Sequence, residues 1–308
     1  MNKMFSISDP AVIQAAWQAL VQPEYLYDEW RFRQCFFDDK IQRLSVYVDN
    51  ETAPTAMLPL QQHKDSGKLS FIGAPFMERN RGFCRSGFED KLYDAYLALP
   101  QGTELDDIAP NDPITRSEFC TPGDPAYVLH RDQVDLQQPD GLYRYLPKNI
   151  RENLRKTRKK VDAGTLLVEH TAPHETLSQA RTLSRDRFGD DSWLEVPYVV
   201  DGFAELFRTG AEFGVTMDAV TLVSQNVVVA ACISATYRST YYMLAAAAEH
   251  DPAWSGLGSY LYYTCMLRGF DAGCDQIDTG IGDCGWKERW GLQTIPQFLF
   301  SNKRKIST

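Results

Sequence analysis

Charged side chains flank a glycine turn near the carboxyl end of the sequence. Asp278, Asp283 and Lys287 lie around the turn 280–282, where polar groups come close together. Asp283 is predicted to act as a general base or to contact a substrate amine, and Asp278 is predicted to contact the substrate. Lys287 is predicted to be a catalytic residue whose ammonium holds a substrate carboxylate or phosphate. The structural alternative is that Asp283 caps a short following helix and Lys287 pairs with it.

A second acidic group follows a predicted strand. Glu249 comes directly after the strand predicted over 240–248, with His250 and Asp251 beside it. A carboxylate at this position is a further candidate for the base that deprotonates an attacking amine. A polar strand-to-loop turn is the equally ordinary structural interpretation.

Two glycines begin a helix shortly after this strand. The turn comprises Ser255, Gly256, Leu257, Gly258 and Ser259, and the helix is predicted over 259–272. A helix amino terminus carries unpaired N–H groups and a partial positive charge, and glycines let a pyrophosphate approach the main chain. The turn therefore predicts a phosphate-binding site, against the alternative of a purely structural turn.

The segment 148–161 is a predicted helix with seven basic residues and one acidic residue. A narrow stripe of it is predicted to face the core, made by Ile150, Leu154, Thr157 and Val161. Arg151, Arg155 and Arg158, spaced i, i+4 and i+7, are predicted to line one side of it and bind a phosphate group. The alternative is a solvated face whose cations pair with carboxylates of this acidic chain.

The residues before this helix predict a first unit of mixed structure. An exposed loop is expected over 111–125, where Pro, Asp and Gly are frequent. Helices are predicted over 10–21, after a capping Asp9, and over 88–99. Strands over 43–48, 53–60 and 68–73 predict an antiparallel meander, and two more strands flank the loop.

The residues after the basic helix predict a second unit. Their pattern predicts a strand, two helices and three antiparallel strands, followed by the glycine turn and a helix. A further strand, a helical turn and a final strand complete the predicted order. A strand, a helix and a second strand in this order place two parallel strands side by side. We therefore predict an α/β (α+β) protein with mixed central sheets flanked by helices, divided into units at 1–145 and 146–308.

This order, with RENLRKTRKK, WSGLGSYL and DTGIGDCGWKERWG, resembles the GCN5-related N-acetyltransferase (GNAT) family. The branch it resembles is the CelD-like and Fem-type (FemAB) one, whose members join two GNAT-like units. The resemblance implies that the edge of the strand over 240–248, including Ala247 and Ala248, binds the pantetheine of acyl-CoA. Ala253 stands where the usual turn has Gln or Arg, and Fem-type relatives take their acyl group from an aminoacyl-tRNA instead.

The leading functional hypothesis is an N-acyltransferase that moves an acyl group from a thioester, acyl-CoA, to the amine of a small or peptide-like acceptor by direct attack. Acyl-CoA is then a co-substrate, and no tightly bound cofactor is expected. One alternative is a Fem-type aminoacyltransferase that uses aminoacyl-tRNA. The other is a non-catalytic GNAT-like binding module.

Composition and charge restrict the classes of partner. The chain has 308 residues, 44% of them hydrophobic, and a net charge of -9, which disfavours a broad footprint on tRNA. Its seven cysteines are scattered without a CxxC pair, and its five histidines show no ligand spacing, so no metal site is expected. With no run long enough to span a bilayer and no signal peptide, we expect a cytoplasmic protein.

Overall fold

The computed structural model describes residues 4–138, 140–250, 254–282 and 285–303. The chain folds as two compact units, Met1–Pro125 with Pro296–Thr308, and Ala126–Ile295. This division differs from the predicted one at 145/146. Residues 126–130 pair with strands of the second unit, and residues 298–301 return to pair with strands of the first.

The second unit is built on one seven-stranded sheet of order β11-β12-β13-β14-β15-β10-β16. Within the residues that the structure describes, β14 and β15 are the one parallel pair of this sheet, which confirms the predicted mixed sheet and the predicted β-α-β connection through α8. The bounds are β10 (Ala126–His130), α4 (Gly141–Tyr145), α5 (Lys148–Asp162), β11 (Leu167–His170), α6 (Pro173–Phe188), α7 (Pro197–Thr209), β12 (Val215–Ser224), β13 (Val227–Tyr237), β14 (Thr240–Ala248), α8 (Leu257–Asp271), β15 (Gln276–Ile281) and β16 (Gln293–Ile295).

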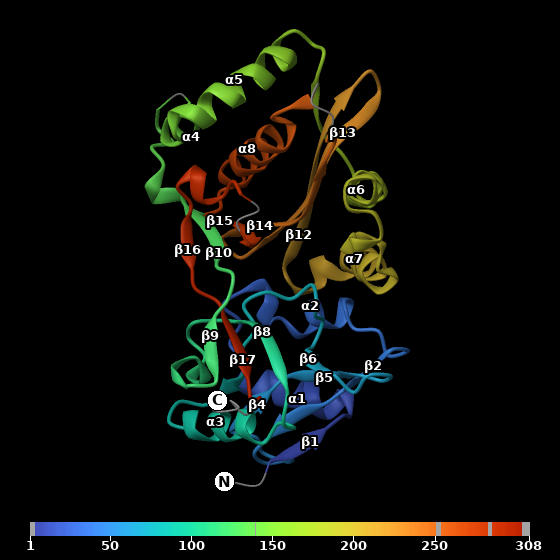
Figure 1. Ribbon diagram of the computed structural model, residues 1–308, viewed down its shortest axis with the longest axis vertical. Coiled ribbons are helices and arrows are strands. Elements are labelled where there is room, and N and C mark those ends of the chain that lie inside the picture. Colours follow the sequence, from blue (N-terminus) through green and yellow to red (C-terminus); the bar gives the residue numbers. More distant parts are fainter. Residues whose placement is uncertain (1–3, 139, 251–253, 283–284, 304–308) are drawn as a thin grey trace, which may run out of the picture. The chain divides into compact units, whose positions relative to one another are not determined.

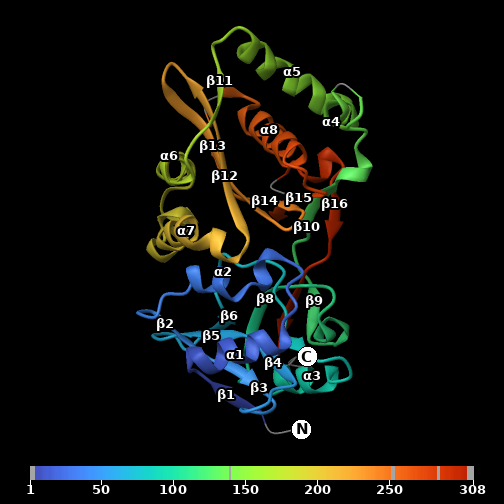
Figure 2. The ribbon, with the colours of Figure 1, turned by 180° about the vertical axis from the view of Figure 1, so that it is seen from behind.

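Helices cover both faces of this sheet. Figures 1 and 2 show α8 on one face with α5 outside it, and α6 and α7 on the other face. Gly269 sets the approach of α8, because a Cβ there would lie 2.5 Å from Cδ1 of Ile277 and 2.8 Å from Cβ of Tyr241. The glycine lets the backbone near the carboxyl end of α8 lie directly on the two parallel strands.

The basic helix α5 packs through the predicted apolar stripe. Ile150, Leu154 and Thr157 are buried, while Arg155 and Arg158 are exposed. The stripe joins the same hydrophobic core as the buried face of α8. The sequence pattern therefore predicted the buried side of α5 correctly.

The first unit contains three small sheets, of orders β1-β3-β4-β7, β2-β5-β6 and β8-β17-β9. All of their ladder pairs are antiparallel. The bounds are β1 (Phe5–Ile7), α1 (Pro10–Leu20), α2 (Trp30–Cys35), β2 (Gln42–Leu44), β3 (Val46–Val48), β4 (Ala56–Leu58), β5 (Leu60–His63), β6 (Leu69–Phe71), β7 (Phe83–Cys84), α3 (Glu89–Leu97), β8 (Glu104–Ile108), β9 (Cys120–Pro122) and β17 (Phe298–Ser301).

The predicted meander is present but is shared between two sheets. The strands break at Ser45 and Pro59, so β3 and β4 pair in one sheet while β2, β5 and β6 pair in another. Pro59 has no N–H to give to a ladder, which explains the break in its strand. The predicted cap of the first helix is confirmed, since Asp9 Oδ1 accepts from Ala11 N at 2.8 Å.

The segment 111–125 is not the exposed loop that its composition predicts. It contains a 3₁₀ turn (Pro113–Arg116) and β9, and it buries Asp112 and Ile114. Asp112 accepts hydrogen bonds from Gly82 N at 2.7 Å, from the Tyr96 hydroxyl at 2.7 Å and from Ile114 N at 2.9 Å. A buried carboxylate thus ties β7, α3 and this segment together.

Burial raises the pKa of Asp112 to about 6 despite these three donors. The native state therefore holds the proton of the Asp112 carboxyl more tightly than the unfolded chain does, because an aspartate in an unfolded chain has a pKa of about 3.9. The stability that the group contributes is complete below about pH 4 and is lost as the pH rises through about 6. We expect Asp112→Asn to flatten the fall in melting temperature between these values, in thermal melts recorded as a function of pH.

Asp107 provides a companion variant for this prediction. Burial also raises the pKa of Asp107 to about 6, so Asp107→Asn removes a second group of similar titration while leaving Asp112 in place. Each single variant should remove part of the pH dependence. A melting curve of Asp112→Asn that runs parallel to the wild type from pH 4 to 6 would contradict the assignment.

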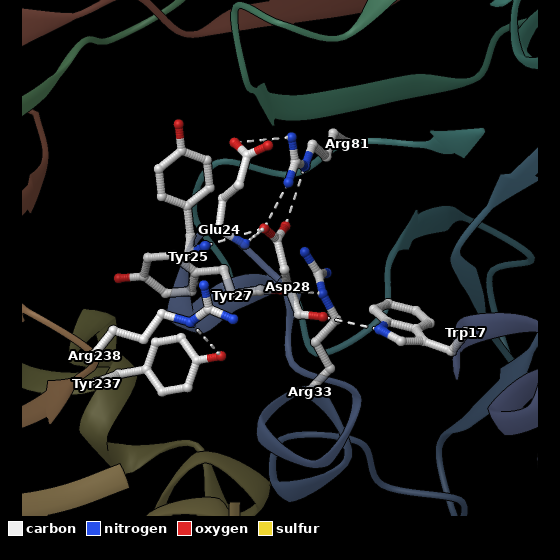
Figure 3. A network of polar contacts seen from close by, with 9 residues as sticks. All are labelled: Trp17, Glu24, Tyr25, Tyr27, Asp28, Arg33, Arg81, Tyr237 and Arg238. Atoms are coloured by element: carbon white, nitrogen blue, oxygen red, sulfur yellow. Dashed lines mark hydrogen bonds and ion pairs between the residues drawn. The ribbon is translucent and has the colours of Figure 1, made fainter. Parts of the chain in front are cut away.

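A buried charge network stabilises the turn before α2 in the first unit (Figure 3). Asp28 is fully buried and binds the Arg81 guanidinium at 3.2 Å and 2.7 Å. Arg33, also fully buried, donates to the carbonyls of Tyr27 and Ile72. Burial lowers the pKa of Arg33 to about 10, because the charged guanidinium has lost its water.

Candidate functional site

The two parallel strands of the second unit separate after three residue pairs. Thr240 pairs with Gln276, and the pairing ends where Tyr242 meets Asp278. The rest of β14 remains paired with β13, with Leu244 bulged out of register. Among the strand pairs of the described residues, none joins 243–248 to β15, so this edge of β14 faces a gap in the sheet.

The amino terminus of α8 lies at the end of the same strand. Gly256 caps the helix with a φ of +93°, and its carbonyl accepts from Tyr260 N at 3.0 Å. The N–H groups of 257–259 come before the first hydrogen bond that the helix itself makes. They point along the helix axis with its partial positive charge, as an anion site requires.

Gly256 and Gly258 differ in how strictly their positions require glycine. Gly256 needs its positive φ, and a Cβ there would lie 3.1 Å from Thr157 Oγ1 of α5. Among the atoms of the described residues, a Cβ at Gly258 would come within 4 Å of Ala248 Cβ alone, at 3.9 Å. A side chain at 258 would therefore project toward the end of β14 without disturbing the helix.

A cleft of 620 Å³ connects the end of β14 with this turn. Its volume is within the range of small-molecule sites. All seven predicted donor-binding residues line it, and so does Glu249. The donor-binding set is Ala247, Ala248, Ser255, Gly256, Leu257, Gly258 and Ser259.

Several lining residues were not predicted. Trp254, Tyr262 and Trp286 give the cleft aromatic walls, and Arg187 and Arg289 add two cations. The rings of Tyr262 and Trp286 contact each other with centroids 4.3 Å apart. No spacing in the sequence connects Arg187, at the end of α6, with α8.

The structure places one of the three predicted catalytic residues, Glu249, in the cleft. Glu249 is exposed and lines the cleft, while its backbone N–H donates to Val229 O at 2.8 Å and so fixes the end of the strand. Asp283 lies outside the described residues. Lys287 is buried, and its Nζ donates to the carbonyls of Gly280 and Ile281 at 2.9 Å and 3.0 Å. Lys287 therefore positions the glycine turn and does not line the cleft.

The predicted substrate contacts are not gathered at the cleft. Asp278 is buried where the two strands separate, and its Oδ1 accepts from Gly280 N at 3.0 Å. Arg158 pairs with Asp140 at 3.4 Å, and this carboxylate raises the pKa of the arginine. None of the three arginines, Arg151, Arg155 and Arg158, lines the cleft.

Within the part of the chain that the structure describes, no group of three or more His, Cys, Asp or Glu side chains has an arrangement that holds a metal ion. None of the described helices has both the length and the hydropathy needed to cross a bilayer.

The sequence matches one family model over residues 148–288, described as an acetyltransferase (GNAT) domain. Three solved structures are similar in fold. They are L-PGS from Bacillus licheniformis (12% identity, TM-score 0.57, 97% of this chain and 94% of that one), FemX (10%, 0.59, 97% and 98%) and a tandem GNAT protein from the clavulanic acid biosynthesis pathway (12%, 0.55, 97% and 97%). No curated protein sequence matches this chain.

Proposed function

We propose that the protein transfers an acyl group from a coenzyme A thioester to an amine, as the match of residues 148–288 to an acetyltransferase (GNAT) domain supports. One observation carries the proposal. The unpaired edge of β14 and the amino-terminal turn of α8 meet in a single cleft of 620 Å³. A donor with a peptide-like arm and a phosphate group matches both features.

Each wall of the cleft has a role toward such a donor. The N–H and C=O groups along 243–248 are oriented to pair with the amides of the pantetheine arm, as in strand addition. The first turn of α8 binds the pyrophosphate. Arg187 and Arg289 add positive charge to the same cleft, which compensates for Ala253 at the position where the related turn has Gln or Arg.

The reaction requires little from the protein beyond orientation and one proton acceptor. Once the ammonium has lost a proton, the amine nitrogen forms a bond to the acyl carbon while the carbon–sulfur bond breaks, and the thiolate takes up the second proton that the nitrogen releases. Glu249, exposed in the cleft at the end of β14, is one candidate to accept the first proton from the ammonium, and Asp283 is the other. Lys287 acts indirectly, by holding the carbonyls of the turn 280–281.

A second candidate donor is an aminoacyl-tRNA. The basic helix α5 favours it, because Lys160 of this helix reaches Trp254 of the cleft, with its Nζ 4.4 Å from the ring centroid. Binding to tRNA through such a helix weakens steeply with salt. The net charge of -9 acts against the wider footprint that tRNA requires.

The test is amide formation detected by mass spectrometry. The protein is incubated with acetyl-CoA or longer acyl-CoAs, or with aminoacylated tRNA, and with a panel of small and peptide-like amines. We expect an acylated amine to appear only with a coenzyme A thioester. Product formed only from aminoacyl-tRNA, in a salt-sensitive reaction, would replace the first donor with the second.

A further inference from the structure

Trp254 is an aromatic surface fixed at the phosphate end of the donor cleft. It comes two residues before Gly256, lines the cleft and is half-buried against the hydrophobic core of the second unit. A ring held in this way loses little conformational entropy when it binds a ligand. The Trp254 residue is only partly buried, and a stacking partner must keep some exposed surface.

The helix α5 lies directly behind this turn and brings a cation to Trp254. Thr157 is buried, and its Oγ1 would contact a Cβ at Gly256, so the two segments are in close contact. Lys160, one helical turn farther on, lies over the Trp254 ring. Lys159 is exposed and lies on the opposite side of α5 from Thr157, because two residues along a helix rotate the direction by about 200°.

We infer that Trp254 and Lys160 form a subsite for the nucleotide end of a coenzyme A donor. The adenine stacks on the indole, and the Lys160 ammonium pairs with the 3′-phosphate. The assignment rests on the proposed coenzyme A donor and extends the donor site to α5, a helix outside the strand, turn and helix that bind the pantetheine and pyrophosphate. The chemistry recognised is an aromatic base with a phosphate close by, which an indole and an ammonium match.

The test is calorimetric titration of the full chain with adenosine 3′,5′-bisphosphate, the nucleotide half of coenzyme A. We expect Trp254→Ala to weaken binding about tenfold or more, because stacking on an aromatic ring contributes on that scale. Trp254→Phe keeps a ring and should stay within about threefold of the wild type. Lys160→Ala should weaken binding and reduce its salt dependence, whereas Lys159→Ala, the same charge change on the same helix, should do neither.

A second pair of ligands tests the phosphate contact. Coenzyme A should bind more tightly than dephospho-coenzyme A, and the difference should vanish in Lys160→Ala. Wild-type affinity in both Trp254→Ala and Lys160→Ala would overturn the subsite while leaving acyl transfer from coenzyme A intact. Competition by a CCA-ended RNA hairpin, with coenzyme A without effect, would also overturn it by assigning the surface to tRNA. If no thioester binds or is consumed, the proposed function itself fails.

Discussion

Gly258→Glu should lower the affinity for coenzyme A by at least about a hundredfold without unfolding the protein. The open space at Gly258 directs the new side chain toward Ala248 and the cleft. Its carboxylate then occupies the positive end of α8 and repels the donor phosphates, and a hundredfold corresponds to about 2.7 kcal/mol. The helix itself should become slightly more stable, because glycine is a weak helix former and an acidic residue suits the first turn.

Two variants at the same position separate charge from volume. Gly258→Ala should bind coenzyme A nearly as well as the wild type, because Ala248 Cβ, the nearest atom of the described residues, is 3.9 Å from the position of its Cβ. Gly258→Gln has the size of glutamate without its charge and should show an intermediate loss. Isothermal calorimetry measures the three affinities, and thermal melts check the fold. Unchanged affinity in Gly258→Glu would show that donor phosphates bind elsewhere.

Asp28→Ala should destabilise the first unit by about 3–5 kcal/mol, as expected when one partner of a buried ion pair is removed. Asp28 is fully buried and accepts from Arg81 at 2.7 Å, from Glu24 N at 2.9 Å and from Tyr25 N at 3.1 Å (Figure 3). Without it, the Arg81 guanidinium loses its buried counter-charge, and Arg33 loses the carboxylate that favours its charged form. Urea denaturation followed by tryptophan fluorescence measures the change.

Glu24 is the matched control for this experiment. It pairs with the same arginine, at 3.3 Å, but its side chain is 57% exposed. Surface ion pairs contribute about 0–1 kcal/mol, so Glu24→Ala should cost little. Equal losses of stability in the two variants would contradict the interpretation of Asp28 as a buried anchor of the network.

The parts of the proposed donor site that depend on local pattern were predictable. A strand, a glycine turn and an apolar-rich helix are predicted one after another between residues 240 and 272, and the structure forms β14, Gly256 and α8 there. The buried stripe of α5 follows from the spacing of its residues. Local rules were sufficient for these features because each one is encoded within a single segment of the sequence.

Features that depend on long-range packing were not predictable. Trp254 meets Lys160 across 94 positions of sequence, and Arg187 and Trp286 reach the cleft from segments before β12 and after β15. Lys287 directs its ammonium to two backbone carbonyls, a choice that neither spacing nor charge reveals. The division of the meander at Ser45 and Pro59 likewise depends on which strands are neighbours in space.

Backbone hydrogen–deuterium exchange with and without coenzyme A tests the donor site most directly. The edge of β14 and the first turn of α8 carry the N–H groups that the donor should occupy. Slowed exchange confined to 243–249 and 255–260, and absent in Gly258→Glu, is the predicted result. Binding of coenzyme A that leaves exchange in both segments unchanged would contradict the proposal that this cleft holds the acyl donor.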